Sequence, residues 1–585
     1  MKQRRLLSKP IAYILFGFTG FLFLFCVLTE RELAASGNIV WTAGHTLQIL
    51  GISLAAGGIL GTLVCALFCR WAETGSLSGK HCKPAERTVG QKTSPFDKLS
   101  QWILREADAK NAWRVFAGSL LLIFLSWLPA FLAYYPAICA YDIPVQTEQI
   151  VSGMYIDHHP IAHTLLLKGA IVLGENVFGN VNAGIGCYAL LQMISLAAAF
   201  AFGMYCLCGR GVRRVWLILV QLFCMLYPFH HYMSVSATKD TIFSAFFLVC
   251  LLALVEILQG KKSYAPLFVL SGTGLILFRN NGKYAFLVLL FFLLMTLIFD
   301  RHRRRFRGKI FVLAVVTFLA GNIALTGIFK AVNAQQGDKR EMLSIPIQQL
   351  ARTMVYHGGV GVMAEDDGAM SDTDRALVND FLLDEAYREY RPDFADPVKR
   401  HTNTYVARYR AKEFLTTYLG LFLQFPGDYL NAALAVDAGY LYPGDVSHAY
   451  INAQEGEASG GGYVQTRWDE ARLREIGIVK DSKWPGLWRH MEKWADDNAY
   501  LQMPVLKYLF VPGVWIWLYL LLVQWLLLTR QFARCLPLTL VFGYFLTLLL
   551  GPTVQLRYLY PIMAAFPFLL ILSVSRKKTD TEILL

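Results

Sequence analysis

Charged residues are scarce in this chain of 585 residues. Lysine, arginine, aspartate and glutamate together make up 17% of it, whereas hydrophobic residues make up 55%, and the mean hydropathy is +0.41. A soluble protein of this length needs far more polar side chains to cover its surface. The composition therefore predicts an all-α polytopic membrane protein.

Several familiar enzyme motifs are also missing. The chain has no Walker loop, no dinucleotide-binding Gly-x-Gly-x-x-Gly, no Gly-x-Ser-x-Gly elbow and no His-Glu-x-x-His zinc helix. ATP-driven, redox and ordinary hydrolase chemistry therefore have no support. Cysteine is equally uninformative: nine of the eleven lie in or beside apolar runs, Cys82 lies in a basic linker, and only Cys139 lies in a predicted outward loop. A disulfide framework is not expected.

Twelve apolar runs are long enough, or nearly so, to cross a bilayer, which takes ~20 helical residues. The first follows a basic N-terminus without a small-residue cleavage site, so we expect it to be retained as a helix. The runs cover residues 10–29, 46–69, 116–135, 183–208, 214–230, 238–258, 264–278, 284–299, 310–330, 505–528, 535–550 and 558–574.

The net charge of +13 is distributed between these runs rather than along a nucleic-acid-binding surface. If the N-terminus is cytoplasmic, every second connection is basic, as the positive-inside rule requires. We therefore predict about twelve spans, with both ends of the chain in the cytoplasm. Nucleic acid is not an expected partner. The basic segments are 70–114, 209–214, 260–262, 301–309, 529–534 and 576–578.

This topology requires that residues 161–178 do not cross the membrane, because a crossing there would turn every later basic segment outward. The segment is short and carries His163, Lys168 and Glu175. We therefore predict a helix that lies at the outer interface. Residues 414–434, interrupted by Pro426-Gly427-Asp428, are also predicted to lie along the membrane surface rather than to span it.

The predicted organisation has five parts. A mainly helical extracytoplasmic domain precedes the last three helices, and a catalytic outer loop at 136–182 lies within the first transmembrane core. The parts are a two-helix extension at 1–69, a basic cytoplasmic linker at 70–115, the transmembrane core at 116–330, the extracytoplasmic domain at 331–504, and the C-terminal helices and cytoplasmic tail at 505–585.

Polar residues gather in four loops that this topology places on the outer face. Cations at a boundary between water and lipid suit a phosphate whose lipid tail stays in the bilayer. A carboxylate beside them suits a general base. The loops contribute Asp142, Asp157, His158 and His159; then His230, His231, Lys239 and Asp240; then Arg279, Asn280, Asn281 and Lys283; and finally Gln555, Arg557 and Tyr560.

Each of these residues also has a purely structural interpretation. Asp142 could cap a helix or a turn before Pro144, and the two histidines could form a polar helix start. Lys239 and Asp240 could form a local ion pair, and the arginines could be interfacial anchors.

The layout resembles the GT-C superfamily of polytopic glycosyltransferases: an aspartate in the first large outer loop, then a His-Pro segment leading into an interfacial helix. The segments "YYPAICAYDIPVQTEQIVSGMYIDHHPIAHTLLL", "SVSATKDTIFSAF", "FRNNGKYAF", "IPIQQLAR" and "LRYLYP" are more closely similar to an uncharacterised bacterial family of such membrane proteins. The similarity covers residues from about 116 to 575. Many superfamily members have His-Pro-Pro where this chain has His159-Pro160-Ile161.

The resemblance implies an inverting membrane glycosyltransferase at the extracytoplasmic side of the cell membrane. It would transfer a sugar from a polyprenyl-phosphate donor, held in the membrane lipid, to a cell-envelope acceptor that is a glycan, a lipid or a protein. Asp142 would be the general base. His158 and His159 would orient substrate or, with Asp142, hold a divalent cation such as Mg²⁺ or Mn²⁺. The implied substrate-binding residues are Lys239, Asp240, Arg279, Asn280, Arg557 and Tyr560.

Two alternatives remain open at this stage. A polysaccharide polymerase or ligase would place essential arginine and histidine residues within 331–504 and make Asp142 dispensable. A lipid-linked sugar transporter or flippase would place charges at mid-bilayer and show two related halves, and the sequence shows neither. A purely structural membrane component gives no reason for four polar loops to share one level.

Overall fold

A computed structural model describes residues 6–74, 100, 102–140, 142–299, 304–337, 339–444 and 464–575. Most of the predicted basic linker (75–99), residues 301–303 of the Arg-rich connection and the tail at 576–578 lie outside the described residues. Over the described ranges the chain is helical and forms no β-strand, only isolated bridges.

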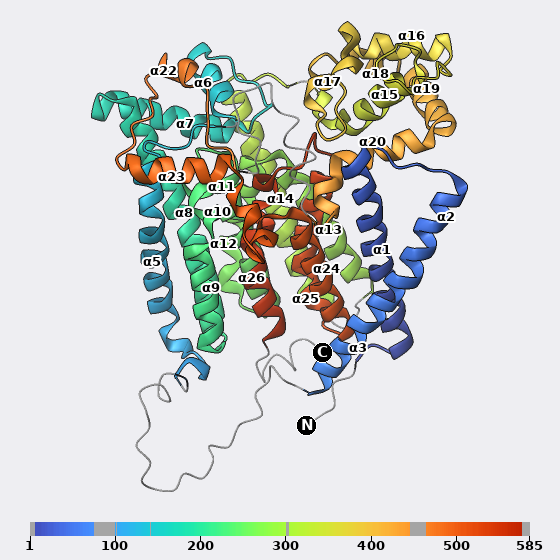
Figure 1. Ribbon diagram of the computed structural model, residues 1–585. Helices are drawn as coiled ribbons and strands as arrows, with labels where there is room; N and C mark the ends of the chain where they lie inside the picture. The colour runs from blue at the N-terminus through green and yellow to red at the C-terminus, as the bar shows by residue number, and fades with distance from the viewer. Residues whose placement is uncertain are drawn as a thin grey trace, which may run out of the picture.

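Each predicted apolar run is helical, and the helices run side by side in Figure 1. Nine helices in the described part of the chain are long and apolar enough to cross a membrane, or ten if the bent pair α9–α10 counts as one span. The protein is therefore an all-α, multi-pass membrane protein, and twelve spans remains a prediction. The helices that correspond to the twelve predicted apolar runs are α1 (Lys9–Ser36), α2 (Ala43–Ile52) continued by α3 (Gly58–Thr74), α5 (Ala112–Ala133), α8 (Val181–Gly209), α9 (Arg214–Leu226) with α10 (Pro228–Val235), α11 (Lys239–Leu258), α12 (Ala265–Phe278), α13 (Asn280–Phe299), α14 (Arg304–Ala331), α24 (Pro512–Leu528), α25 (Phe532–Leu548) and α26 (Leu556–Val574).

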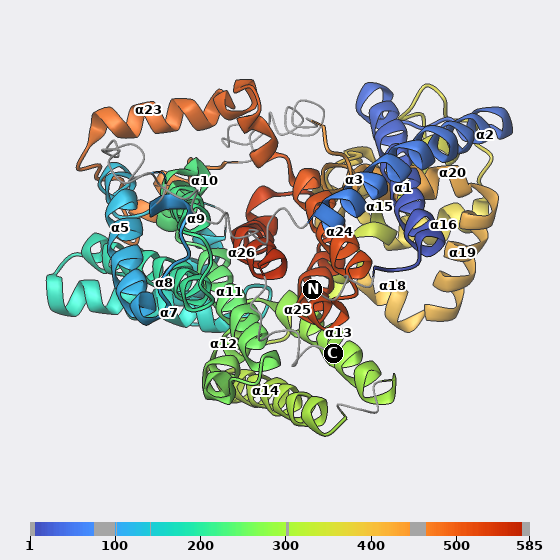
Figure 2. The same ribbon diagram turned by 90° about the horizontal axis from the view of Figure 1, so that it is seen from below.

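Helix α7 (Ile161–Leu173), extended to Phe178 by a π-turn, belongs to the segment predicted to lie at the interface. It is one of the nine helices that could cross a membrane by length and composition. In Figure 1, however, it lies across the upper end of the bundle and not along it, and in the view from below in Figure 2 it is seen lengthwise. This is the orientation that the charge pattern predicts.

The two ends of the bundle differ in what they carry. The turns between α8 and α9 and between α24 and α25 lie at the lower end in Figure 1, as does the end of α26. The domain built from residues after α14 lies at the upper end. The basic turns and this domain are thus at opposite ends.

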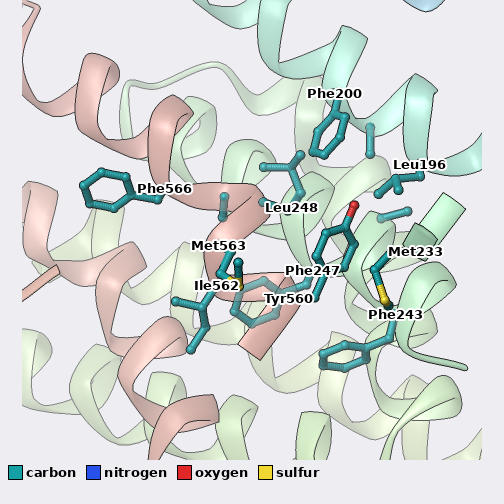
Figure 3. Packing of buried hydrophobic residues seen from close by; sticks show 14 of the residues in the cluster. Leu196, Phe200, Met233, Phe243, Phe247, Leu248, Tyr560, Ile562, Met563 and Phe566 are labelled. Atoms are coloured by element: carbon teal, nitrogen blue, oxygen red, sulfur yellow. The ribbon is translucent and has the colours of Figure 1, made fainter. Parts of the chain in front are cut away.

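The centre of the bundle is an apolar packing of α8, α11 and α26 (Figure 3). Most side chains of α11 and α26 are buried. Tyr560 lies inside this packing, and its hydroxyl is 2.8 Å from His230 Nδ1 of α10. The apolar packing fixes α11 against α26, and the Tyr560–His230 contact joins α26 to α10, so the residues at the upper ends of these helices take fixed positions.

Residues 331–504 occupy two places. One group of helices, which we call the upper domain, has its own apolar core and lies beside the N-terminal helices. By contrast, α22 (Glu470–Arg474) and α23 (Pro485–Asp496) lie over α6 and α5 on the other side and join the core of the bundle. The upper domain comprises α15 (Ser344–His357), α16 (Asp372–Phe381), α17 (Asp396–Arg400), α18 (Thr404–Tyr409), α19 (Ala411–Gln424) and α20 (Pro426–Leu441).

The N-terminal hairpin packs through glycine. A Cβ at Gly61 of α3 would lie 2.0 Å from the carbonyl oxygen of Phe16 of α1, so only glycine permits the two helices to approach this closely. The loop after α1 then contacts the upper domain: Arg352 donates to Asn38 Oδ1 at 2.8 Å, and Trp41 donates to Asn431 Oδ1 at 2.8 Å.

Candidate functional site

Residues from the four predicted polar loops meet at the upper end of the bundle. Asp142 precedes α6 (Ile143–Ser152), Lys239 and Asp240 open α11, Arg279 follows α12, and Arg557 lies in the first turn of α26. Asp142 and Arg557 are 415 positions apart in the sequence, yet Arg557 Nη1 is 3.4 Å from Asp142 Oδ2. We call these five residues the charged cluster.

Local sequence explains why these side chains lie at helix ends. Pro144 stands in the first turn of α6, where its missing N–H costs nothing. Thr238 caps α11: its hydroxyl accepts the N–H of Asp240 at 3.4 Å and donates to Asp240 Oδ2 at 3.2 Å. The Asp240 carboxylate thus lies at the positive end of the α11 dipole.

Two cations and a histidine lie around Asp142. Lys239 forms a direct ion pair with its Oδ2 atom, Arg557 lies at 3.4 Å, and His159 Nδ1 lies at 3.9 Å. Burial alone would raise the pKa of Asp142, but the charges of Lys239 and Arg557 hold that pKa well below its usual range. Asp142 is therefore ionised at neutral pH.

Asp240 forms the buried side of the cluster. It is fully buried and is ion-paired with Arg279, while Arg557 Nη1 lies 3.5 Å from its second oxygen. The Arg279 guanidinium also lies 4.6 Å from the centre of the Tyr558 ring. This second pair is enclosed by protein, so it serves to position Arg557 between the two carboxylates.

Arg557 connects the two halves. Its Nη1 atom faces both Asp142 and Asp240, its Nε donates to Gln555 Oε1 at 2.6 Å, and its Nη2 donates to Tyr558 Oη at 3.1 Å. The cluster holds three cations and two carboxylates, which leaves one positive charge in excess. The outer pair is the more accessible: the side chains of Lys239 and Asp142 are 12% and 14% exposed.

The two adjacent histidines differ. Burial, reinforced by Lys239 and opposed by Asp142, lowers the pKa of His159 to about 3, so its ring is neutral. Its Nδ1 atom accepts from Lys239 Nζ at 3.3 Å. His158 is exposed and stacks edge-on against His159 at 4.4 Å between ring centres. His159 is thereby joined to the charged cluster.

The structure places two predicted substrate-binding residues away from the cluster. Asn280 is exposed, and its amide donates to the carbonyl oxygen of Asp157 at 3.5 Å. Tyr560 is buried in the apolar core with His230 (Figure 3). Asp157 itself accepts the N–H of Gly337. These contacts join neighbouring segments and do not face the charged cluster.

A divalent cation does not fit the residues predicted to hold it. Lys239 Nζ contacts both Asp142 Oδ2 and His159 Nδ1, so an ammonium group already lies between the two side chains. Within the described ranges no three His, Cys, Asp or Glu residues are grouped as metal ligands. The lysine ammonium already supplies the positive charge at this point.

A buried polar network beneath α6 was not predicted. His163 Nδ1 lies 3.0 Å from Gln146 Oε1, and His163 Nε2 lies 2.7 Å from Tyr188 Oη. Gln146 also donates to Thr164 at 3.0 Å. The network ties α6 to α7 and α8 and so fixes the helix that carries Asp142. The signals in the sequence are His163, a polar residue in a mostly apolar segment, and Gln146, which falls one helical turn after Asp142.

A comparison with protein families identifies the family to which this chain belongs. One family model matches residues 151–582, which is well over half of the chain. The chain belongs to this family of unknown function, DUF6020. The matched region includes Lys239, Asp240, Arg279 and Arg557, whereas Asp142 precedes it. No curated protein and no solved structure matches the chain.

Proposed function

We propose that this DUF6020 protein is an inverting membrane glycosyltransferase with a GT-C-like architecture. It transfers a sugar from a polyprenyl-phosphate donor to a cell-envelope acceptor at the extracytoplasmic face. The observation that carries this proposal is the position of Arg557 Nη1, 3.4 Å from Asp142 and 3.5 Å from Asp240. Arg557 thus brings a carboxylate and an excess of positive charge together at one end of the helix bundle.

The donor phosphate binds at the accessible part of the cluster in this proposal. Lys239 and Arg557 present N–H donors beside Asp142, and the excess positive charge favours an anion there. The lipid tail of the donor remains in the bilayer beside the helices, since the cluster lies where the helices end. Asp240 and Arg279 stay buried and hold Arg557 in place.

Binding of the donor also activates the base. In the free protein Lys239 and Arg557 stabilise the Asp142 carboxylate and make it a weak base. A phosphate competes for both cations, which lets the pKa of Asp142 return toward its ordinary value. The base thus gains strength only when the donor is present.

The transfer forms one bond at the anomeric carbon and breaks another. Asp142 takes the proton of the acceptor hydroxyl, and the hydroxyl oxygen attacks the anomeric carbon on the face opposite the phosphate. The bond between that carbon and the phosphate oxygen breaks, and polyprenyl phosphate leaves with the electron pair. Lys239 and Arg557 stabilise the charge that develops on the leaving oxygen.

The extracytoplasmic assignment depends on the distribution of charge. The basic turns lie at the lower end of the bundle and the charged cluster at the upper end. Because basic connections stay in the cytoplasm, the cluster faces outward.

The polymerase or ligase alternative would use arginine and histidine of the upper domain. Arg352 and His357 do meet Asp428 there, each at 2.9 Å. Arg352 is fully buried, however, and it also binds Asn38 of the N-terminal hairpin. These contacts fasten two parts of the protein together, so they do not favour the alternative.

The proposal is tested by incubating the purified full-length protein with a polyprenyl-phosphate sugar and an extract of envelope acceptors. We expect release of polyprenyl phosphate and a product whose anomeric configuration is opposite to that of the donor. Movement of the intact donor between leaflets without loss of its sugar would instead identify a flippase.

A further inference from the structure

The upper domain carries an apolar surface that no described part of the protein covers. It lies on α19, where Leu415, Leu419, Phe422 and Leu423 are 54%, 55%, 39% and 78% exposed. These residues recur at helical spacing, so they form one stripe along α19, which we call the apolar stripe. Single exposed apolar side chains are ordinary in any protein, whereas a continuous row of them marks a surface that contacts something other than water.

Helix α19 has three distinct faces. Phe414 and Leu421 lie on the first and pack into the apolar core of the upper domain. The apolar stripe is the second. The third is exposed and polar, and carries Thr416, Gly420 and Gln424. A helix whose exposed half is itself divided into an apolar and a polar face is typical of a helix that meets protein, lipid and water at once.

The end of α19 is held at the tip of two membrane-crossing helices. Residues 37–42 connect α1 to the helix of α2 and α3, and both helices have the length and composition of spans. Trp41 in this connection donates to Asn431 Oδ1 of α20 at 2.8 Å, and a Cβ at Gly427 would lie 2.9 Å from its ring. Gly427 is the second residue of α20. The corner between α19 and α20 therefore lies at the membrane boundary, level with the upper ends of α1 and α2 in Figure 1.

The apolar stripe adjoins a surface that faces lipid. Leu47 and Leu54 of the second span are each 68% exposed, as expected where a span meets acyl chains. Leu430, in the first half of α20, is 45% exposed. In the view from below, α19 lies at the outer edge of the molecule, beyond α1 and α3 (Figure 2). The bundle thus does not separate α19 from the membrane.

The residues just before the apolar stripe are those of a membrane–water interface. Tyr405 and Tyr409 of α18 are each 67% exposed, and their rings stack with centres 5.7 Å apart. Arg408 and Lys412 are exposed beside them in the chain. Tyrosine, lysine and arginine are typical of the headgroup region, and leucine is typical of the acyl region. The order along the chain therefore runs from headgroup to acyl chain as α19 approaches the corner.

We propose that the apolar stripe of α19 inserts into the leaflet at the upper end of the bundle. Leu419 and Leu423 then lie among the acyl chains, and Lys412 lies at the headgroups. The sequence predicts that all of 414–434 lies along the membrane, but α20 packs against α1 and α15, so the lipid contact belongs mainly to α19. A second copy of the chain fits less well, since a stable dimer buries about 800 Å² on each partner, more than four side chains of one helix offer.

Photo-cross-linking tests this proposal in the full-length protein, placed in nanodiscs of phosphatidylcholine. The photoreactive amino acid benzoylphenylalanine is introduced at position 419 or at position 416, and the adducts are identified by mass spectrometry. Both positions are exposed on α19 and differ in the face on which they lie. We expect phosphatidylcholine adducts at 419 and few at 416. Equal lipid labelling at the two positions, or a cross-linked dimer in place of the lipid adduct at 419, would overturn the proposal.

A matched pair of charged variants tests the same contact without a probe. Leu419→Asp places a carboxylate among acyl chains, whereas Thr416→Asp places it in water. Amide hydrogen exchange of residues 411–424 in the same nanodiscs is expected to be about fivefold faster in Leu419→Asp than in the wild type, and unchanged in Thr416→Asp. If Leu419→Asp does not fold, Leu423→Gln, at the most exposed position of the stripe, must show the same acceleration. Wild-type exchange in a folded stripe variant would contradict the proposal.

Discussion

Lys239, the first residue of α11, forms an ion pair with Asp142, which lies 97 positions earlier in the chain. The same ammonium lies 3.3 Å from the neutral ring of His159. One lysine therefore both holds the proposed base in its ionised form and offers a positive charge to an incoming phosphate.

Lys239→Gln is expected to raise the KM for the lipid donor by about tenfold or more, since one charge-assisted contact to phosphate is lost. It also removes the largest attraction that lowers the pKa of Asp142. Because the base must be deprotonated, the acid limb of the pH–rate profile moves to higher pH. Steady-state kinetics between pH 4 and 8 measure both effects. Lys283→Gln, at the same end of the bundle, is the control and should change neither.

His159 makes stability depend on pH. Its folded pKa of about 3 is lower than the ordinary value of 6.5, so the unfolded chain binds a proton first as pH falls. The stabilisation is fully present above about pH 6.5 and is lost progressively below it. We expect a lower melting temperature at pH 5 than at pH 7.5, and a smaller difference in His159→Gln. Equal differences in the two proteins would mean that His159 is not buried in its neutral form.

Arg352 is expected to fasten the N-terminal hairpin to the upper domain. Arg352→Ala removes its bonds to Asp428 and Asn38 and leaves partly buried acceptors, at a cost of roughly 2–4 kcal/mol. Limited proteolysis should then cut the loop at residues 37–42 faster than in the wild type. Arg388→Ala, which removes an exposed pair with Glu385, should leave the rate unchanged. An equal rate for Arg352→Ala would show that the hairpin docks without this residue.

The orientation in the membrane can be mapped with single reporter fusions after residues 178, 305 and 480. We expect 178 and 480 outside and 305 inside, since residue 305 lies in the most basic connection. An external position for 305 would reverse the predicted topology and place the charged cluster in the cytoplasm.

The helices of the bundle could be predicted from sequence because a span requires a long apolar run, and such runs are unmistakable. The apolar run at residues 214–230 predicts one straight span, yet α9 and α10 meet there at an angle of 53°. Pro228 opens α10 and cannot continue the hydrogen bonds of α9. The division of residues 331–504 between two places leaves no comparable mark in the sequence.

The charged cluster was predictable in composition but not in geometry. The charge pattern predicts the topology of the chain, and that topology puts the loops that carry Asp142, Lys239, Arg279 and Arg557 at the same end of the bundle. Which cation meets which carboxylate depends on how the helices pack, and local sequence does not encode that. Tyr560 illustrates the limit: it lies three residues, or about 4.5 Å of helix, beyond Arg557 and points into the apolar core.

The central claim is that Asp142 accepts a proton beside a phosphate-binding group of cations. Its most direct test is the single-turnover rate of sugar transfer by Asp142→Asn, with saturating polyprenyl-phosphate sugar. Asp157→Asn is the matched control, since that carboxylate lies in the same loop but binds the backbone of Gly337. We expect a loss of at least ~100-fold for Asp142→Asn, with donor still bound, and little change for Asp157→Asn. Full transfer activity in Asp142→Asn would show that Asp142 is not the base.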